Sequence, residues 1–593
     1  MASVQRGSLL ILFALWLVIY FAGIFSPALL DDVDTVHAEA AREMVLRHDW
    51  VTLYANGIRY LEKAPLMYWG VAASYTVFGA SEWSTRLPLV MGVWALILAT
   101  CWLGSRCFGE RGGFYSGLVM ATALGPYLFT RFLIPDVLVG LWLTLTFLFF
   151  LRTLEEDVPP RWACWGLAAV TALNVLTKGL IGLVFPVGVI GGYLILTGNI
   201  KHIFRMRVFS STVVFLVIAV PWHVLAALRN PSQGAVRGFL WFYFVNEHYL
   251  RYLNKRIPRD YDTVPLWLFW GLLLLWLFPW IAFFARSLRE VPLRWRDWRS
   301  RMTMRQRAEL LFLLWAIVIL VFFSFSTRQE YYTIPAIPAL ALLVGAWLDR
   351  EESSAPGSPE KRSAITSSLV LLVVGVIGFV AGAFLLFASK APAPGTDLAD
   401  LLLKHPQDYA LSFGHFFDLT PQALGAFQGP LLGASLSLLL GTGFNWFLRR
   451  RNNPRHANWA LTLMMVGLFT CVHASFVTFS PILSSKTLAM AIGKQYQPGD
   501  TIVILGKYED ASTLNFYLHE PLRSLHIPTG NMWYGAQFPD APRVWETQAS
   551  FTELWRGSGR VFLWTEQENP PELANLNLHE LARSGGKFIY SNR

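Results

Sequence analysis

Charged residues of the types needed for group transfer stand in one polar stretch near the N-terminus. Asp31, Asp32 and Asp34 follow an apolar run, and the pair Glu62-Lys63 comes later in the same stretch. Aspartate is a favoured N-cap residue, so helix capping can account for one of these acids. A positioned carboxylate can also accept the proton of an attacking hydroxyl, and a lysine can stabilise negative charge on a leaving phosphate. The stretch is therefore a candidate site for such chemistry, unless Glu62-Lys63 is only an exposed ion pair.

More charged residues stand where apolar runs end. Asp136 follows a proline, Lys178 lies in a Thr-Lys-Gly turn, and Glu247, His248 and Arg251 lie on adjacent turns of an aromatic-rich segment. Each of these has a structural alternative. Asp136 can be an acid that simply faces water, Lys178 can extend its charge to the membrane interface, and the aromatic residues can form an interfacial belt. An unpaired charge between apolar runs is costly, which favours a functional interpretation.

Composition places these residues in a membrane protein. The chain has 593 residues, of which 54% are apolar and only 15% charged, which is too apolar for a soluble protein of this size. The net charge of +10 comes from short loops between apolar runs, so it indicates topology and not a nucleic-acid partner. The four cysteines predict no disulfide framework. We interpret the first apolar run as an uncleaved helix.

The apolar runs predict thirteen membrane spans, since a span needs about 20 apolar residues. They are centred near residues 18, 95, 121, 143, 169, 188, 217, 275, 315, 340, 376, 438 and 468. With the N-terminus in the cytoplasm, every Lys- and Arg-rich loop, including the arginines between 286 and 307, falls on the cytoplasmic side. We therefore predict a membrane domain over 1–483, with external loops at 29–84 and 229–263.

The first of these loops has its own local pattern. From Val33 to Met44 apolar residues recur at helical spacing, which predicts an amphipathic helix on the membrane surface. An Asn-Gly turn follows at 56–57, and Pro65 opens the next apolar run. The acids and the Glu-Lys pair are thereby expected to converge near the headgroups.

After the last apolar run the composition changes to that of a small soluble domain. Residues 484–593 predict an α/β domain on the external face. Its expected helices lie near 488–496 and 511–518, and its expected strands at 501–505, 560–564 and 587–590.

The order of residues in the first loop resembles that of the GT-C glycosyltransferases, above all the bacterial aminoarabinose transferases and the protein O-mannosyltransferases. The matching residues are His37-Ala38-Glu39, Arg42-Glu43-Met44, Asp49-Trp50-Val51, Asn56-Gly57, Tyr60, Glu62-Lys63, Pro65-Leu66 and Tyr68-Trp69. Val33 stands where the family has its aspartate, Asp34 where it has a glutamate, and Ala64 where it has a proline. Either Asp32 or Asp34 can therefore do the family's acidic work.

The resemblance implies a polytopic α-helical GT-C fold with a small C-terminal domain. It implies transfer of a sugar from a polyprenyl (undecaprenyl) phosphate to an envelope acceptor, by a single displacement with inversion. The acceptor can be lipid A, another glycan or a protein. The reaction would take place on the external face of a bacterial inner membrane, with the C-terminal domain on the periplasmic side.

The resemblance also implies residue roles. Asp32, Asp34 and Asp136 are the expected catalytic carboxylates. Glu62 and His248 are the expected ligands of a possible divalent metal. The expected contacts of the donor phosphate are Lys63, Arg59, Tyr60, Lys178, Arg251, Arg328 and Tyr332.

Two other classes remain open from the sequence. A transporter or lipid flippase is also polytopic, but it is expected to carry paired broken helices and charges deep within its spans. A catalytically inactive relative is the other alternative, because the acids of the first loop depart from the family pattern.

Overall fold

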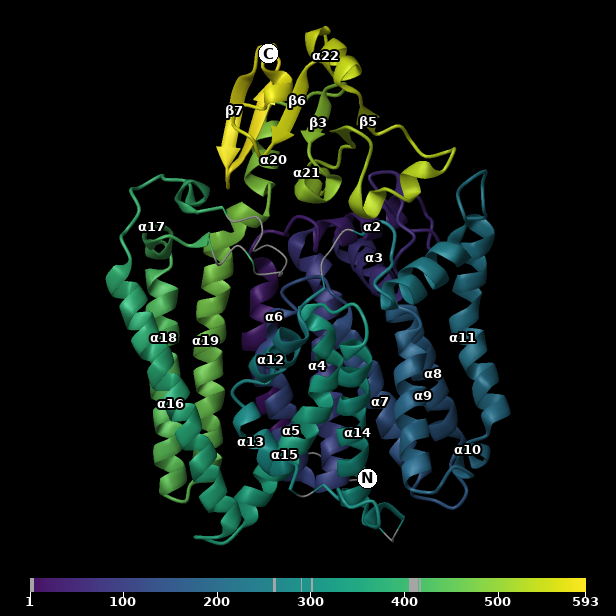
Figure 1. Cartoon of the computed structure of the whole chain (residues 1–593), viewed down its shortest axis with the longest axis vertical. Coiled ribbons are helices and arrows are strands. Elements are labelled where there is room, and N and C mark those ends of the chain that lie inside the picture. The colour runs from purple at the N-terminus through teal and green to yellow at the C-terminus, as the bar shows by residue number, and fades with distance from the viewer. Residues whose placement is uncertain (1–4, 260–262, 290, 300–301, 405–413, 415–417) are drawn as a thin grey trace.

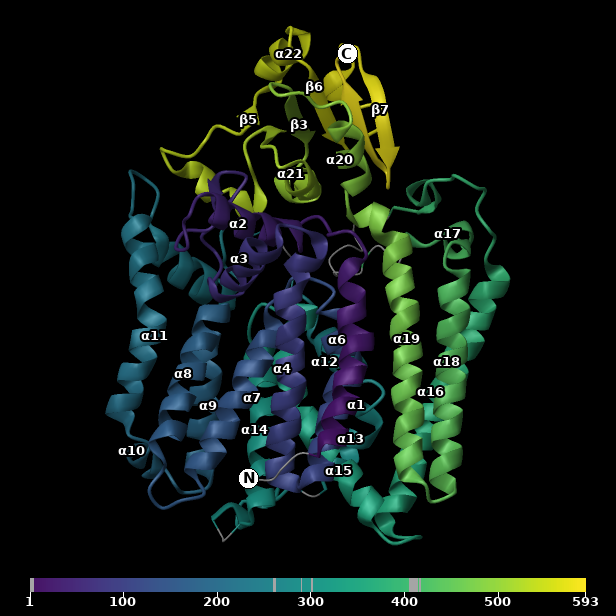
Figure 2. The same ribbon diagram turned by 180° about the vertical axis from the view of Figure 1, so that it is seen from behind.

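The computed structural model describes residues 5–259, 263–289, 291–299, 302–404, 414 and 418–593. Long helices stand side by side in a bundle, and a domain built on a β-sheet covers one end of it (Figures 1 and 2). Helix α1 begins at the opposite end of the bundle (Figure 2). This arrangement confirms a helical membrane protein with a separate C-terminal domain.

Among the described residues, nine helical segments are long and apolar enough to cross a membrane. They are Arg6–Phe25 (α1 Arg6–Trp16, η1 Leu17–Phe21 and η2 Ala22–Phe25), α4 (Glu82–Phe108), α7 (Asp136–Thr153), α11 (Val208–Arg229), α14 (Met304–Ser324), Glu330–Ser353 (η5 Glu330–Ala336 and α15 Ile337–Ser353), α16 (Pro359–Ala388), α18 (Gln428–Arg450) and α19 (Pro454–Leu483). A tenth span forms if α12 (Leu266–Trp276) and α13 (Ile281–Ser287), which meet at 96°, are taken together.

The predicted count of thirteen spans is not confirmed. The three other predicted centres fall on α5 (Glu110–Thr122), α8 (Arg161–Lys178) and α9 (Ile181–Leu196). Helices α5 and α9 have only 13 and 16 residues, which is less than the length that a span needs. The other short helices of this part are α6 (Leu124–Leu128), α10 (His202–Arg205) and α17 (Pro421–Gly425).

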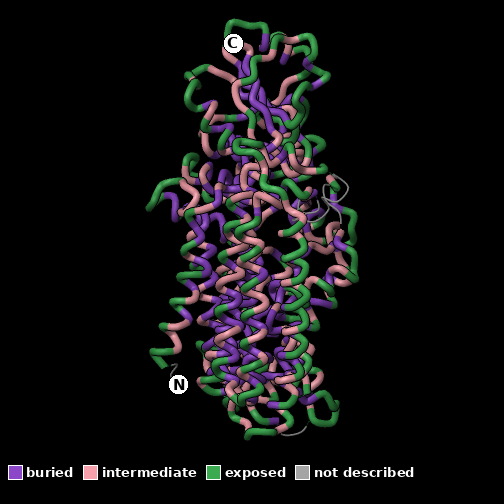
Figure 3. Tube along the Cα trace, turned by 90° about the vertical axis from the view of Figure 1, so that its left-hand side faces the viewer, coloured by how far each residue is buried: buried purple, intermediate pink, exposed green. Residues whose placement is uncertain are grey.

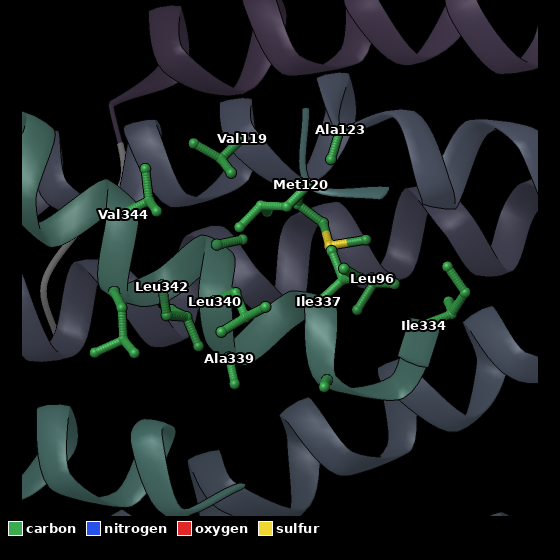
Figure 4. Packing of buried hydrophobic residues seen from close by; sticks show 14 of the residues in the cluster. Leu96, Val119, Met120, Ala123, Ile334, Ile337, Ala339, Leu340, Leu342 and Val344 are labelled. Atoms are coloured by element: carbon green, nitrogen blue, oxygen red, sulfur yellow. The ribbon is translucent and has the colours of Figure 1, made fainter. Parts of the chain in front are cut away.

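The centre of the bundle is a close-packed apolar core. Leu96 of α4, Met120 of α5 and Ile337 of α15 interdigitate there (Figure 4). Small residues let these helices approach closely, since a Cβ on Gly113 would lie 2.4 Å from the backbone nitrogen of Ser105. The rigid core fixes the helix ends that border the site.

The C-terminal domain contains a six-stranded sheet in the order β5-β4-β3-β6-β8-β7. Strands β5, β4, β3 and β6 are parallel, and β8 pairs antiparallel with both β6 and β7. Its middle strands are buried (Figure 3). The strands are β3 (Thr501–Leu505), β4 (Leu522–Leu525), β5 (Trp545–Glu546), β6 (Val561–Thr565), β7 (His579–Ser584) and β8 (Lys587–Ser591), and the helices are α20 (Lys486–Gly493), α21 (Ser512–Leu518) and α22 (Gln548–Arg556).

The first loop folds into helix α2 (Thr35–Leu46), a hairpin of β1 (Tyr54–Ala55) and β2 (Ile58–Arg59), and helix α3 (Leu66–Phe78). Asn56 and Gly57 take left-handed conformations with φ of 51° and 77°, as the Asn-Gly signal predicts. Helix α2 does not present a polar face to a membrane surface as expected, because it packs between α3 and α21 and shares their apolar cluster. Its acids Glu39 and Glu43 are buried and form ion pairs with Arg42 and Arg47.

The second predicted external loop, 229–263, contains a wide helical segment, η3 (Trp241–Leu250). Its residues 260–262 lie outside the described part of the chain, as does Arg301 of the arginine-rich loop that is predicted to be cytoplasmic. Segment η3 and the first loop together bring charged side chains to the end of the bundle that the C-terminal domain covers.

Candidate active site

A cavity of about 1280 Å³ lies where the helix bundle, the first loop, η3 and the C-terminal domain meet. Residues separated by hundreds of positions share its wall, from Asp32 in the first loop to Lys587 in the last strand. This size exceeds the needs of a single sugar ring and suits a ligand with several parts.

Glu62 organises the cations of the cavity. Its carboxylate lies 3.4 Å from Nζ of Lys63 and 2.5 Å from a guanidinium nitrogen of Arg256. Burial alone would raise the pKa of Glu62, but Lys63 and Arg256 outweigh it and lower the pKa to about 2. Glu62 is therefore ionised at neutral pH and holds both cations in place. Lys63 keeps 34% of its side chain exposed, so its charge is available to a ligand.

Glu247 of η3 completes this network from the other side. It binds Arg256 at 2.7 Å and Arg251, one helical turn further on, at 3.2 Å. Arg251 also donates a hydrogen bond of 3.1 Å to the hydroxyl of Tyr332. The structure thus brings together Lys63, Arg251 and Tyr332, which the sequence assigns to the donor phosphate.

Lys178 lies at the C-terminal end of α8, where Gly179 with φ of 72° ends the helix. It forms an ion pair with Asp136, the first residue of α7. Its Nζ lies 5.0 Å from the ring centre of Tyr332. Lys178 lines the cavity. Asp136 does not line the cavity, but its carboxylate holds Lys178 in place.

The aspartates of the first loop have different environments. Asp34 is buried, accepts hydrogen bonds from the backbone amides of Leu30 and Leu133, and lies 3.7 Å from Arg86. It does not line the cavity, so the structure favours an anchoring role for Asp34. Asp32 is exposed in the cavity wall, with a left-handed φ of 60°.

Asp31 instead joins the two parts of the protein. Its carboxylate binds Lys587 at 2.9 Å and the backbone amide of Thr513 at 2.8 Å. Of the three neighbouring acids, the structure therefore leaves Asp32 as the candidate base.

Two predicted phosphate contacts lie elsewhere. Arg59 makes two hydrogen bonds, of 2.5 and 2.7 Å, to Asp540 of the C-terminal domain. Arg328 donates to the backbone carbonyls of Val264, Ser324 and Ser326. Neither arginine lines the cavity, whereas Tyr60 does.

The predicted metal ligands are not arranged around a common ion. The Nε2 atom of His248 accepts a 3.1 Å hydrogen bond from the amide of Leu180, and its Nδ1–H donates to the carbonyl of Tyr243 at 2.6 Å. A metal ligand needs a free ring nitrogen, and Glu62 is bound to cations. In the described part of the chain no group of three His, Cys, Asp or Glu residues could hold an ion. These side chains do not fit a shared metal, and a metal requirement stays a prediction.

Sequence reasoning missed Arg256 and the contributions of the C-terminal domain. Arg256 reaches Glu62 across 194 residues of sequence, so no local period marks it. The missed residues of the C-terminal domain that line the cavity include Glu509, Asp510, Glu566 and Lys587.

Comparisons with known proteins match this geometry. The family described as dolichyl-phosphate-mannose-protein mannosyltransferase matches residues 62–224. The crystal structure of ArnT from Cupriavidus metallidurans bound to undecaprenyl phosphate superposes on the chain with a TM-score of 0.82 and 25% identity, covering 99% of this chain and 98% of that one. The matched segment is therefore a GT-C glycosyltransferase domain, and the whole chain has the fold of ArnT.

Two transferases are similar to the chain in sequence. The undecaprenyl phosphate-α-4-amino-4-deoxy-L-arabinose arabinosyl transferase of Yersinia enterocolitica is 25% identical over 477 residues, which is 78% of this chain and 76% of that protein. The Yersinia pestis (strain Pestoides F) protein of the same name is 27% identical over 353 residues, which is 58% of this chain and 59% of that protein.

Proposed function

We propose that the protein transfers a sugar from a polyprenyl monophosphate of the undecaprenyl type to a hydroxyl of an envelope acceptor. The observation that carries this proposal is the set of cations, Lys63, Lys178, Arg251 and Arg256, in one cavity at the end of a membrane bundle. Three carboxylates, Glu62, Glu247 and Asp136, hold these four cations in place. The likeness to a structure that holds undecaprenyl phosphate supports the same donor lipid.

In this mechanism the phosphate of the donor binds Lys63, with Arg251 and Tyr332 beside it. The acceptor oxygen attacks the sugar carbon from the face opposite the phosphate, and the bond between carbon and phosphate oxygen breaks with its electron pair going to the phosphate. Negative charge grows on the phosphate as the bond breaks, so a fixed cation stabilises the transition state more than the bound donor. Asp32 takes the proton of the acceptor hydroxyl, and the configuration at the attacked sugar carbon is inverted.

We place this reaction on the external face of the inner membrane, with the N-terminus in the cytoplasm and the C-terminal domain outside. Loops rich in Lys and Arg support this orientation, because they fall at the end of the bundle away from the cavity, as at α10. A donor linked to a membrane lipid suits an external site, where nucleotide sugars are not available.

The acceptor can be lipid A, another glycan or a protein. The arrangement of charges disfavours the alternative of a transporter, because the cations of the cavity gather at one end of the bundle. A catalytically inactive relative would keep the cavity but transfer nothing, so activity has to decide that alternative.

Mass spectrometry of lipid A, glycans and envelope proteins from a deletion strain tests the proposal. One of these fractions should lose a sugar-sized mass in the deletion strain, and the wild-type gene should restore it. A gene with Lys63→Ala serves as the matched control and should not restore it. Unchanged masses in all fractions would contradict transferase activity.

A further inference from the structure

The C-terminal domain brings carboxyl groups to the cavity that the mechanism above does not use. Glu509 and Asp510 lie on η9 (Tyr508–Ala511), a short turn between β3 and α21, and Glu566 follows β6. All three line the cavity together with Asp32. Each sits where a parallel strand ends, which is the edge of a sheet where α/β domains place functional side chains.

Glu509 is buried, and within the described residues only one of its two carboxyl oxygens has a hydrogen-bond partner. The residue is 7% exposed, and its Oε1 accepts a 2.6 Å hydrogen bond from the amide of Asn531. Its Oε2 is buried and has no hydrogen-bond partner within the described residues. An unpartnered buried carboxyl oxygen is costly, so it usually marks a bound proton or a functional role.

The loop beside Glu509 fixes the position of its carboxyl group. Gly530 has φ of 61°, and a Cβ there would lie 2.6 Å from Oε1 of Glu509. Asp32 is tied to the same turn, because its amide donates a 3.0 Å hydrogen bond to the hydroxyl of Ser512, which itself donates to the carbonyl of Glu509 at 3.1 Å. The two acids therefore keep a fixed spacing across the boundary between the domains.

Glu509 differs from the paired carboxyls around the cavity in its charge environment. The others are held by cations, in the pairs Asp31–Lys587, Asp34–Arg86, Asp136–Lys178, Glu62–Arg256 and Glu247–Arg256. Burial raises the pKa of Glu509 to about 8, and the negative charges of Asp32 and Asp510 add to this effect. The nearby lysines act on the other two acids: Lys507 and Lys587 on Asp510, and Lys404 and Lys587 on Glu566.

We propose that Glu509 and Asp32 form one carboxyl pair that receives the proton of the acceptor hydroxyl, so that the C-terminal domain supplies part of the transfer machinery. Asp32 faces the cavity and takes the proton itself as the acceptor oxygen bonds to the sugar carbon and the phosphate leaves. Glu509 is a positioning residue that sets the proton affinity of Asp32. This inference rests on the proposed transfer reaction.

The pair predicts a definite dependence on pH. Below about pH 8 Glu509 carries a proton, so Asp32 has a neutral neighbour. As pH rises through the pKa of Glu509, a negative charge appears beside Asp32 and makes it a stronger base. The rate of transfer should therefore rise across this range.

The test uses full-length protein in proteoliposomes with undecaprenyl phosphate-4-amino-4-deoxy-L-arabinose as donor probe and lipid A as acceptor probe. Single-turnover rates are measured from about pH 6 to about pH 9.5. Glu509→Gln keeps the shape and the neutral state that the side chain has below pH 8, so the rate at about pH 6 should stay near wild type. At about pH 9.5 the rate should be lower about 10- to 100-fold, without the rise near pH 8 and with binding of undecaprenyl phosphate unchanged. Glu509→Asp should retain the rise, and the control Glu566→Gln should retain both rate and profile.

Infrared spectroscopy gives a second readout that needs no turnover. A protonated carboxyl band should titrate near pH 8 in the wild type, vanish in Glu509→Gln and titrate at lower pH in Asp32→Asn, because the repelling charge is gone. A wild-type rate in Glu509→Gln at about pH 9.5, or a reduced rate that keeps its pH profile, would overturn the pair. No transfer by the wild type would count against the proposed function, whereas a band unaffected by Asp32→Asn would count against the pair alone.

Discussion

Replacing Glu62 with glutamine removes one negative charge from the centre of the cation network with little change of shape. Glu62 is 7% exposed and contacts both Lys63 and Arg256. Although burial raises its pKa, these cations lower it from 4.5 to about 2. The surroundings of Glu62 in the folded protein therefore strongly favour its ionised form.

The shift gives the size of the expected effect. Each pKa unit corresponds to about 1.4 kcal/mol, so the ionised Glu62 contributes about 3 kcal/mol to the free energy of unfolding. Because the pKa is lower in the folded state, this contribution is fully present above the ordinary pKa and is lost as pH falls through about 2. At neutral pH Glu62→Gln should cost about 3 kcal/mol, since Arg256 then loses the carboxylate that lies 2.5 Å away.

Unfolding of the purified protein in detergent measures this difference at neutral pH and near pH 3. The gap between wild type and Glu62→Gln should shrink in acid. Glu156→Gln is the control, because Glu156 forms an exposed pair with Arg152 that should contribute less than about 1 kcal/mol. Equal stability of wild type and Glu62→Gln at neutral pH, or a gap independent of pH, would refute this reasoning.

Three further predictions concern residues outside the cavity and the topology. Arg59→Ala should change turnover by less than about threefold, because Arg59 binds Asp540 and does not line the cavity; loss of undecaprenyl phosphate binding in this variant would show that Arg59 contacts the donor. Asp34→Asn should lower the yield of folded protein in detergent size exclusion, since the carboxylate is a buried anchor; well-folded Asp34→Asn without turnover would place Asp34 in the chemistry. Reporters fused after Lys361 and Lys494 should be cytoplasmic and external, respectively, and reports from one side would contradict the topology.

The sequence predicts those parts of the fold that depend on local pattern. Every predicted span centre falls on a helix, because hydropathy is a property of neighbouring residues. The strands expected at 501–505, 560–564 and 587–590 match β3, β6 and β8 within one residue. The short strands β4 and β5 were missed, because four and two residues carry too little periodicity.

The site could be predicted only in part, because its geometry is made by contacts between distant segments. The Glu-Lys motif identified Lys63, but nothing local separates Asp32 from Asp34. That distinction comes from the fold, which turns Asp34 toward backbone amides and leaves Asp32 in the cavity wall. Arg59 likewise finds its partner in a domain that begins hundreds of residues later.

Turnover of Lys63 variants with a synthetic undecaprenyl phosphate sugar tests the central claim most directly. Lys63 is the cation of the Glu-Lys motif that lines the cavity with its side chain 34% exposed. Lys63→Ala should lower turnover about 100- to 1000-fold and not only raise KM, because the lysine acts on charge that develops as the bond breaks. Lys63→Arg should recover only part of it, since a guanidinium has a different shape. Wild-type turnover in Lys63→Ala that elutes as a folded protein would contradict the account.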